Sequence, residues 1–199
     1  SFFHILRVPS YFHGRRPKTM TLNQNDAELF YELWFPLLDY TNKKYKVNAN
    51  LRKMHGAKEL DPNEVKIVAD YLWEHTDVIE EYLADHMLSD DHRSIVSGWK
   101  KCISGQFMLE RHLKKGSVFI STDTEEVYMV NGIMTSWEEM FFYRPLPVLL
   151  KATLVPFRDK IISDGLVIPY NVCFGKGYSS EFKNIYMNAK KNKKIHFSL

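Results

Sequence analysis

Four side chains that could ligate a metal ion lie close together in this 199-residue chain, namely His86, Asp90, Asp91 and His92. Imidazole and carboxylate groups are ligands of zinc and iron. The spacing fits neither HExxH nor another metal-ligand pattern, and the stretch is typical of an acidic loop that caps a helix. We therefore expect no metal site and no cofactor.

Two acidic residues, Glu138 and Glu139, follow Trp137 and suggest acid–base chemistry. Adjacent residues on a helix point about 100° apart, so they do not form a carboxylate pair by themselves. Acids in a first turn that favour the helix dipole are the simpler interpretation. Asp159 and Asp164 are expected to be turn or edge residues. The sequence thus identifies no catalytic residue.

A glycine-containing segment, CFGKGYSS (173–180), precedes a predicted C-terminal helix. Its Lys176-Gly177 resembles part of a phosphate-binding loop, but the full GxxxxGK[ST] spacing is absent. A helix N-terminus after a turn can still attract an anion.

Five basic residues of the C-terminal half are candidate nucleic-acid contacts, namely Arg111, Lys114, Lys115, Lys151 and Arg158. Three aromatic residues accompany them in the sequence, as on a platform that stacks single-stranded bases, and these are Phe119, Tyr128 and Phe157. The alternative is that the aromatic residues are core and the basic residues protect strand edges. We favour this alternative because the basic residues are not clustered in excess over acidic ones.

The C-terminal half has the pattern of a β module. Short runs between turn residues predict strands at 106–113, 117–121 and 126–131. Residues 146–155 are apolar on both faces, which is typical of a strand buried on both sides, and Pro156 should end it. Asp164-Gly165 lies between two apolar runs and predicts a two-residue hairpin turn.

Two helices are expected within this module. Ser136 and Glu139 have the spacing of a capping box for about one helical turn. Ser179 or Ser180 should cap a second helix that continues to about Lys191. Its exposed side carries Lys183, Lys190, Lys191, Lys193 and Lys194.

The N-terminal half is predicted to be helical. The first helix covers residues 25–40, where Pro36 should kink it or end it early, and residues 42–56 should form a loop. Asp61-Pro62-Asn63-Glu64 predicts the start of a second helix. Thr76 and Ser89 are expected to cap a third and a fourth.

Composition indicates a protein with a substantial core, because 45% of the residues are hydrophobic and 14% are aromatic. No apolar run approaches the roughly 20 residues that a membrane helix needs. Residues 20–104 carry 10 basic and 15 acidic side chains, whereas residues 105–199 carry 13 and 9. An acidic helical half and a basic β half could attract each other, so the net charge of +3 is weak evidence for nucleic-acid binding.

Two cysteines, Cys102 and Cys173, do not make a disulfide framework. A reducing cytoplasm is the simplest location for such a chain. Both cysteines are predicted to be buried small hydrophobic residues rather than nucleophiles.

Residues 1–19 differ from the rest of the chain, since they contain four basic residues and no acid. Arg7 interrupts their apolar stretch and no small-residue cleavage site follows, so they are not a secretory signal. We interpret them as a leader or a foreign extension before Met20. The functional alternative is a basic arm for an anionic partner.

Three stretches resemble an uncharacterised family of bacterial proteins that occur mainly in anaerobic, gut-type lineages, and these are RHLKKGSVFIS (111–121), SWEEMF (136–141) and LPVLLKATLVPFRDKIISDGL (146–166). The resemblance extends from about Met20 to Leu199. It implies a bacterial cytosolic protein and says nothing about mechanism.

The sequence as a whole predicts an α+β protein. Residues 20–105 form a helical region, packed on a β module at 106–199, which is a small antiparallel sheet or partly open barrel with a terminal helix. The predicted function is a non-enzymatic binding or adaptor protein with a regulatory role. The sequence does not identify its partner, for which another protein and a nucleic acid are both candidates. A nucleic-acid-binding module that uses the basic β half is the first alternative. An unrecognised hydrolase is the second, since catalytic groups often meet only in space.

Overall fold

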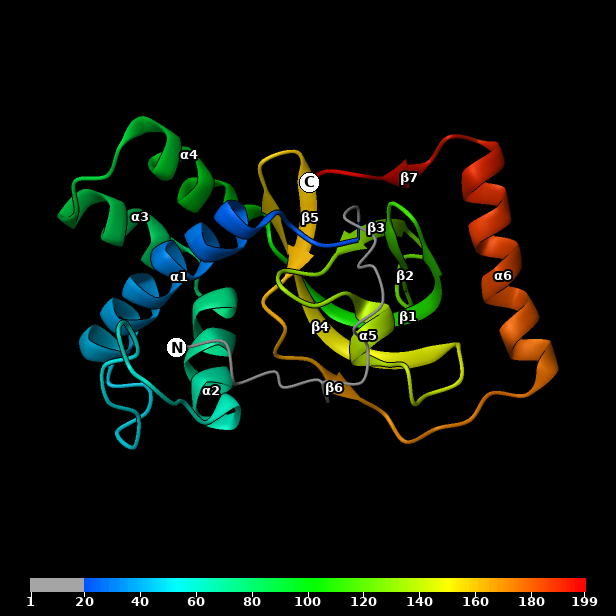
Figure 1. Ribbon diagram of the computed structural model, residues 1–199, viewed down its shortest axis with the longest axis horizontal. Coiled ribbons are helices and arrows are strands. Elements are labelled where there is room, and N and C mark those ends of the chain that lie inside the picture. Colours follow the sequence, from blue (N-terminus) through cyan, green and yellow to red (C-terminus); the bar gives the residue numbers. More distant parts are fainter. Residues whose placement is uncertain (1–19) are drawn as a thin grey trace.

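Helices form the N-terminal half of the chain and a curved sheet forms the C-terminal half, in a computed structural model that describes residues 20–199 (Figure 1). The protein is therefore α+β, as predicted. The interpretations of residues 1–19 lie outside the described residues. The helical half contains α1 (Gln24–Tyr45), α2 (Pro62–Glu74), α3 (Asp77–Asp85), α4 (Asp90–Gly98) and the 3-10 turn η2 (Trp99–Lys101).

The helix starts follow from local capping. Asp61 accepts a hydrogen bond from the backbone N–H of Asn63, with Pro62 as the first helical residue, and Ser89 caps α4 in the same way. Both starts are confirmed. Thr76 precedes α3 at the predicted position, but its side chain makes no capping bond.

The first helix is longer than the sequence predicts, because α1 continues through Pro36 to Tyr45 and shortens the expected 42–56 loop. Buried residues on both sides of the proline hold the helix together, and they include Leu33, Trp34, Leu37, Leu38 and Thr41. Tertiary packing thus overcomes the missing N–H of a proline inside a helix.

Seven strands of the described chain make one mixed sheet. They are β1 (Ile103–Leu113), β2 (Gly116–Ser121), β3 (Val127–Asn131), β4 (Val148–Phe157), β5 (Lys160–Ser163), β6 (Ile168–Pro169) and β7 (Ile195–His196). Their order is β1-β2-β3-β5-β4-β6, with β7 beside β3, and β1 also pairs with β4. The sheet therefore curves back on itself without becoming a true barrel. The first three strands are confirmed.

The expected purely antiparallel sheet is wrong, since β3 pairs in parallel with both β5 and β7. The long connection from β3 through α5 to β4 lets the β4–β5 hairpin approach β3 in this direction. Pro156 does not end its strand either, because β4 continues to Phe157. Beyond Leu154 this strand pairs with β5 and no longer with β1, so a residue without an N–H is tolerated there.

The hairpin predicted at Asp164-Gly165 is also wrong. β5 and β6 pair with different segments of β4 and not with each other. Gly165 does have a positive φ of 80°, so the chain changes direction here as predicted. The residues after this bend do not pair with β5. The actual hairpin joins β4 to β5 through Arg158 and Asp159, with Arg158 at a φ of 53°.

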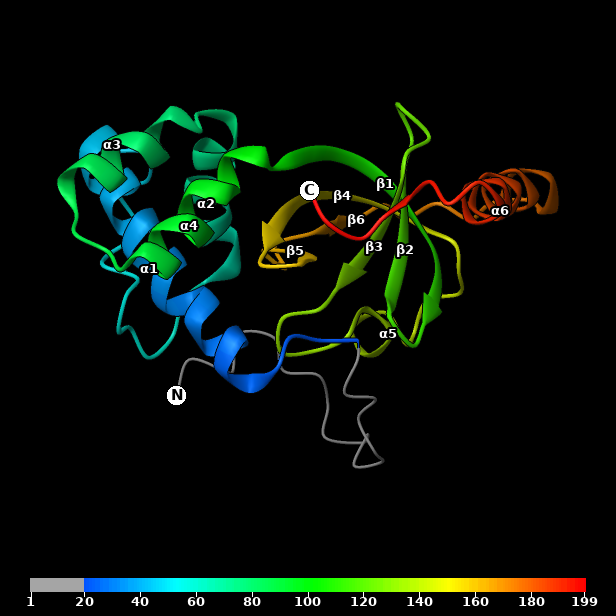
Figure 2. The same ribbon diagram turned by 90° about the horizontal axis from the view of Figure 1, so that it is seen from above.

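Two helices accompany the sheet, as expected. The capping box of Ser136 and Glu139 is confirmed at the start of α5 (Trp137–Met140). The terminal helix α6 (Lys176–Lys191) begins earlier than predicted, after Gly175 rather than after a serine. Phe182 and Tyr186 anchor it on the outer face of β1, β2 and β3, at the end of the molecule opposite to α1–α4 (Figure 2).

The largest hydrophobic cluster joins the two halves. Phe30 of α1 and Trp99 have ring centroids 5.5 Å apart, and Phe30 also approaches Phe157 of β4 at 6.3 Å. Val155 and Ile162 belong to the same cluster. None of the helices between residues 20 and 199 combines the length and apolar character that crossing a bilayer requires.

Candidate functional site

A buried carboxyl group lies where the two halves meet. Asp164 follows β5 and is almost completely excluded from solvent. Its Oδ2 accepts a hydrogen bond from Trp73 Nε1 of α2 at 2.8 Å, and its Oδ1 accepts one from the backbone N–H of Leu166 at 2.9 Å. The expectation of an edge or simple turn residue is therefore incomplete, because a tryptophan 91 positions away supplies a partner.

Electrostatics at this carboxyl group favour the protonated form. Burial raises the pKa of Asp164, while the hydrogen bonds from Trp73 and Leu166 and the charge of Lys66 lower it less. Burial, and then the charge of Asp164, raises the pKa of Tyr31 on α1. Strongly shifted groups often mark functional sites, so the space around them is the first place to look for chemistry.

The nearby Cys102 is an unreactive thiol. Burial raises its pKa to about 11, and its Sγ lies 3.8 Å from the carbonyl oxygen of Trp73. The thiolate needed for nucleophilic attack is therefore scarce at neutral pH. The other cysteine, Cys173, is exposed, which corrects the prediction that both are buried. It follows the short strand β6, in the connection to α6.

A small hollow lies beside Asp164 but does not include it. The hollow is lined from both halves, by Tyr31 of α1, by Ser163 and Gly165 around the end of β5, and by Trp137 of α5. Trp137 is buried, and its Nε1 has no hydrogen-bond partner among the described residues. The space suits about one water molecule, so it is too small for an organic substrate.

A histidine and a serine meet at the β1–β2 hairpin. His112 Nδ1 lies 2.8 Å from Ser117 Oγ, because the register of the two strands places these residues opposite each other. Burial lowers the pKa of His112, and the charge of Glu138 opposes this shift. Ser117 is fully buried, so no substrate reaches its hydroxyl. This pair is a satisfied core contact, and it gives the hydrolase alternative no support.

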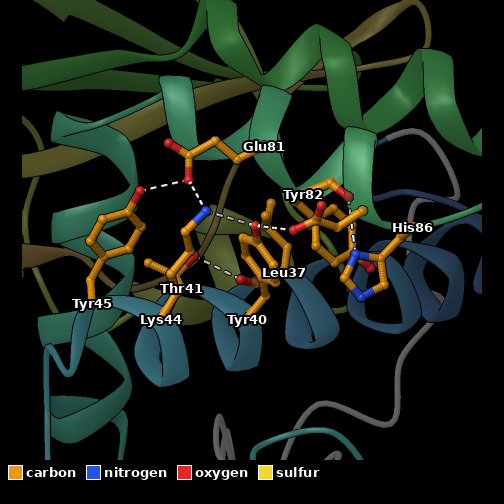
Figure 3. Close-up of polar contacts among 9 residues, drawn as sticks. Leu37, Tyr40, Thr41, Lys44, Tyr45, Glu81, Tyr82 and His86 are labelled. Atoms are coloured by element: carbon orange, nitrogen blue, oxygen red, sulfur yellow. Dashed lines mark hydrogen bonds and ion pairs between the residues drawn. The ribbon is translucent and has the colours of Figure 1, made fainter.

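An exposed polar network connects α1 to α3 (Figure 3). Glu81 Oε2 accepts hydrogen bonds from Lys44 Nζ and from Tyr45 OH, both at 2.6 Å. These two donors lower the pKa of Glu81. Lys44 Nζ also donates to Tyr40 OH at 3.1 Å, and that hydroxyl donates to Asp85 at 2.7 Å. Each charged group has a partner within the network, which therefore fastens two helices together.

The four candidate metal ligands do not converge. The His86 ring stacks on Tyr82 at 4.2 Å, and its Nδ1 lies 3.0 Å from the carbonyl oxygen of the same residue (Figure 3). Asp91 is held by Arg158 instead. Across residues 20–199, no three histidine, cysteine or acidic side chains gather as metal ligands would.

Two of the five basic candidates for nucleic-acid contacts are held by acidic neighbours. The guanidinium of Arg111 donates to Glu110 at 2.9 Å and lies 4.2 Å from the centre of the Tyr186 ring. Arg158 makes a two-pronged contact with Asp91, at 2.9 and 3.0 Å. It also donates to Asp26 of α1 at 3.2 Å, so it connects the β4–β5 hairpin to two helices.

The other three basic candidates lie on different parts of the sheet. Lys114 and Lys115 are exposed in the β1–β2 turn, and the ammonium of Lys115 lies 5.9 Å from the Phe197 ring. Lys151 is exposed in the middle of β4. The aromatic residues expected among them are buried in the core, and these are Phe119, Tyr128 and Phe157. The structure thus brings the five residues to no common aromatic platform.

An exposed apolar surface lies at β6, and sequence reasoning missed it. It consists of Tyr143, Leu146, Ile168 and Val172, which are 62%, 38%, 45% and 49% exposed, and we call it the β6 surface. Two chain segments build it, one before β4 and one around β6. Arg144 joins these segments by donating to the Tyr170 carbonyl oxygen at 3.3 Å and to Asn171 Oδ1 at 3.1 Å.

The composition of these segments could have revealed the β6 surface. Residues 165–175 contain no charged side chain, and residues 141–150 contain only Arg144. The apolar runs at 146–155 and after Gly165 predict strands, but an apolar run alone does not indicate which of its residues are left exposed.

Comparison of the chain with protein-family models, with curated proteins and with solved structures finds no match. The resemblance to a bacterial family therefore stays an expectation, and any functional assignment has to come from the geometry.

Proposed function

We propose that the protein is a non-enzymatic binding protein that holds a partner protein on its β6 surface. The observation that carries this proposal is the exposure of Tyr143, Leu146, Ile168 and Val172 on two adjacent segments that are almost free of charge. Contiguous exposed apolar side chains mark interaction sites in soluble proteins.

The make-up of this surface supports a protein as the partner. Protein interfaces are enriched in aromatic residues and arginine and are depleted of lysine and acidic residues. The two segments follow this pattern, with Tyr143 beside Arg144 and no lysine, aspartate or glutamate in 141–150 or 165–175. A nucleic acid would require a cluster of cations here. Lys151 is exposed opposite Ile168, and Arg144 is engaged by Tyr170 and Asn171, so the cations beside this surface are few.

Main-chain pairing contributes little to this recognition. β6 consists of Ile168 and Pro169, and the Tyr170 N–H donates to Leu149 of β4, so the residue of β6 that faces away from β4 is Pro169, which has no N–H to donate. Side-chain contacts therefore carry the proposed interface. The buried Ser117 and the water-sized hollow beside Asp164 offer no comparable place for a substrate.

The test compares two double variants that add the same negative charge to exposed apolar positions. Tyr143→Asp with Ile168→Asp changes the β6 surface, whereas Ile67→Asp with Met87→Asp changes residues of the helical half that are 48% and 100% exposed. Partners are captured by cross-linking in cells that make the protein naturally, and each is then purified and its Kd measured. We expect the first variant to bind about tenfold more weakly or worse, and the second to bind like the wild type.

Equal binding by the wild type and both folded variants would remove the β6 surface from the proposal. Loss of binding in the helical variant alone would move the interface to α2 and α3.

A further inference from the structure

We propose that α6 carries a second interaction surface, a stripe of lysines that binds the phosphate backbone of a nucleic acid. Lys176, Lys183 and Lys190 recur every seven residues of this helix, and all three are exposed. Residues seven apart lie on nearly the same line along a helix, so the three side chains form one row. We call them the lysine stripe.

The lysine stripe is not neutralised within the protein. No ion pair among the described residues involves any of its three members, in contrast to Arg111 and Arg158. The one acidic residue between 176 and 199 is Glu181, which lies at neither i±3 nor i±4 from any of them. Three ammonium groups in a row therefore face solvent without a counter-charge from the helix.

Helix stability does not account for this arrangement. Lysines in a last turn favour the helix dipole, which explains Lys190. Lys176 is the first residue of α6, where the dipole disfavours a cation, and the first turn contains no acid. Its position is instead explained if the whole row binds one extended anion.

The spacing fits a nucleic-acid strand. Seven residues rise about 10.5 Å along a helix, whereas neighbouring phosphates of a B-form strand advance about 3.4 Å along the duplex axis. The three ammonium groups are therefore far enough apart to bind separate phosphates. Tyr186, at i+3 from Lys183 and i−4 from Lys190, is buried against the sheet, so we expect binding without base stacking or sequence preference.

Two features favour a nucleic acid over an anionic membrane. Phe182 and Tyr186 of α6 are buried against the sheet and are not free to enter a lipid layer. The exposed Tyr178 and Met187 are nine positions apart, on opposite sides of the helix, and so form no apolar face. The acidic helical half lies at the opposite end of the molecule, so it does not repel a polyanion that lies along α6 (Figure 1). Lys191, Lys193 and Lys194 extend the positive charge beyond the row.

The test uses the whole chain and fluorescent 20-nucleotide single-stranded and 20-base-pair duplex DNA. A salt dependence of about −0.9 per phosphate on logarithmic axes predicts a roughly fortyfold loss of affinity between 50 and 200 mM salt for three contacts. Lys176→Glu, Lys183→Glu and Lys190→Glu together should abolish binding. The matched control reverses three exposed lysines of the helical half with the same change in net charge, and these are Lys43, Lys53 and Lys58.

Single Lys183→Gln and Lys190→Gln variants keep the test decisive if the triple variant does not fold. Each should lower the magnitude of the salt slope by about 0.9, which a purely structural role would not do. Absence of DNA binding at 50 mM salt overturns the proposal. So does an equal loss in the control variant, or binding to phosphatidylserine vesicles without binding to either DNA.

Discussion

At the scale of single residues, Asp164 shows how a carboxyl group can be buried without a cation as its direct partner. Two N–H donors, from Trp73 and Leu166, take the place of water around its oxygens. They do not compensate fully, because burial still raises the pKa. The native state therefore binds the proton of Asp164 more tightly than the unfolded chain does.

The pH dependence of stability follows from this shift. The contribution of Asp164 is fully present below the unfolded pKa of about 3.8 and is lost as pH rises through the higher folded value. We expect the urea midpoint of the wild type to fall relative to that of Asp164→Asn as the pH rises above about 4. The asparagine side chain cannot ionise. It has one oxygen in place of two, so one hydrogen-bond acceptor is lost, at a pH-independent cost of about 1 kcal/mol.

Asp164→Leu is the control for the hydrogen bonds, since it leaves the N–H groups of Trp73 and Leu166 unpaired at any pH. A constant difference between the wild type and Asp164→Asn across this range would show that the carboxyl group does not titrate differently in the two states.

At the scale of elements, the turn after β5 directs the chain from the interior of the sheet to its edge. The backbone N–H of Gly165 donates to Ser163 Oγ at 3.3 Å, and that of Leu166 donates to Asp164. Gly165 has a φ of 80°, a conformation that residues with a side chain rarely adopt. The position of β6, and with it part of the β6 surface, depends on this turn.

Substitution at this turn should be costly. We expect Gly165→Val to lower the free energy of unfolding by about 1–3 kcal/mol through backbone strain, and Gly165→Ala to have a smaller effect. Gly177→Ala in α6 is the matched control, because an added Cβ there meets nothing within 4 Å. This control should be neutral or slightly stabilising. The stability of all three variants is measured by their urea midpoints. A Gly165→Val midpoint equal to that of the wild type would contradict the strained turn.

At the scale of the whole molecule, the two halves share one core. Phe157 of β4 packs with Phe30 of α1, and Arg158 beside it binds Asp26 and Asp91 of the helical half. Hydrophobic burial across this contact outweighs the exposed ion pairs, which are weak in water. We therefore expect helices and sheet to unfold together.

Phe157→Ala tests this coupling. Loss of a fully buried phenylalanine should cost about 3–5 kcal/mol and should lower hydrogen-exchange protection in α1 and in β2 by the same free energy. Phe119→Ala is the comparison, because Phe119 is equally buried but belongs to a cluster inside the sheet. Protection that falls in only one half in either variant would show two independent folding units.

The sequence by itself determined the features that depend on neighbours a few residues away. Caps at Asp61, Ser89 and Ser136 and the strands from 103 to 131 follow from local hydrogen bonding and short-range hydrophobic pattern. It also revealed the lysines of α6.

Only the tertiary structure decided which distant groups meet. Three features depend on packing between segments far apart in the chain. They are the hydrogen bond of Trp73 to Asp164, the parallel pairing of β5 with β3, and the continuation of α1 through Pro36. The same holds for the β6 surface, because an apolar side chain is buried or exposed according to what covers it. Sequence pattern records how apolar a segment is, whereas the free energy of the whole fold selects the neighbours that cover it.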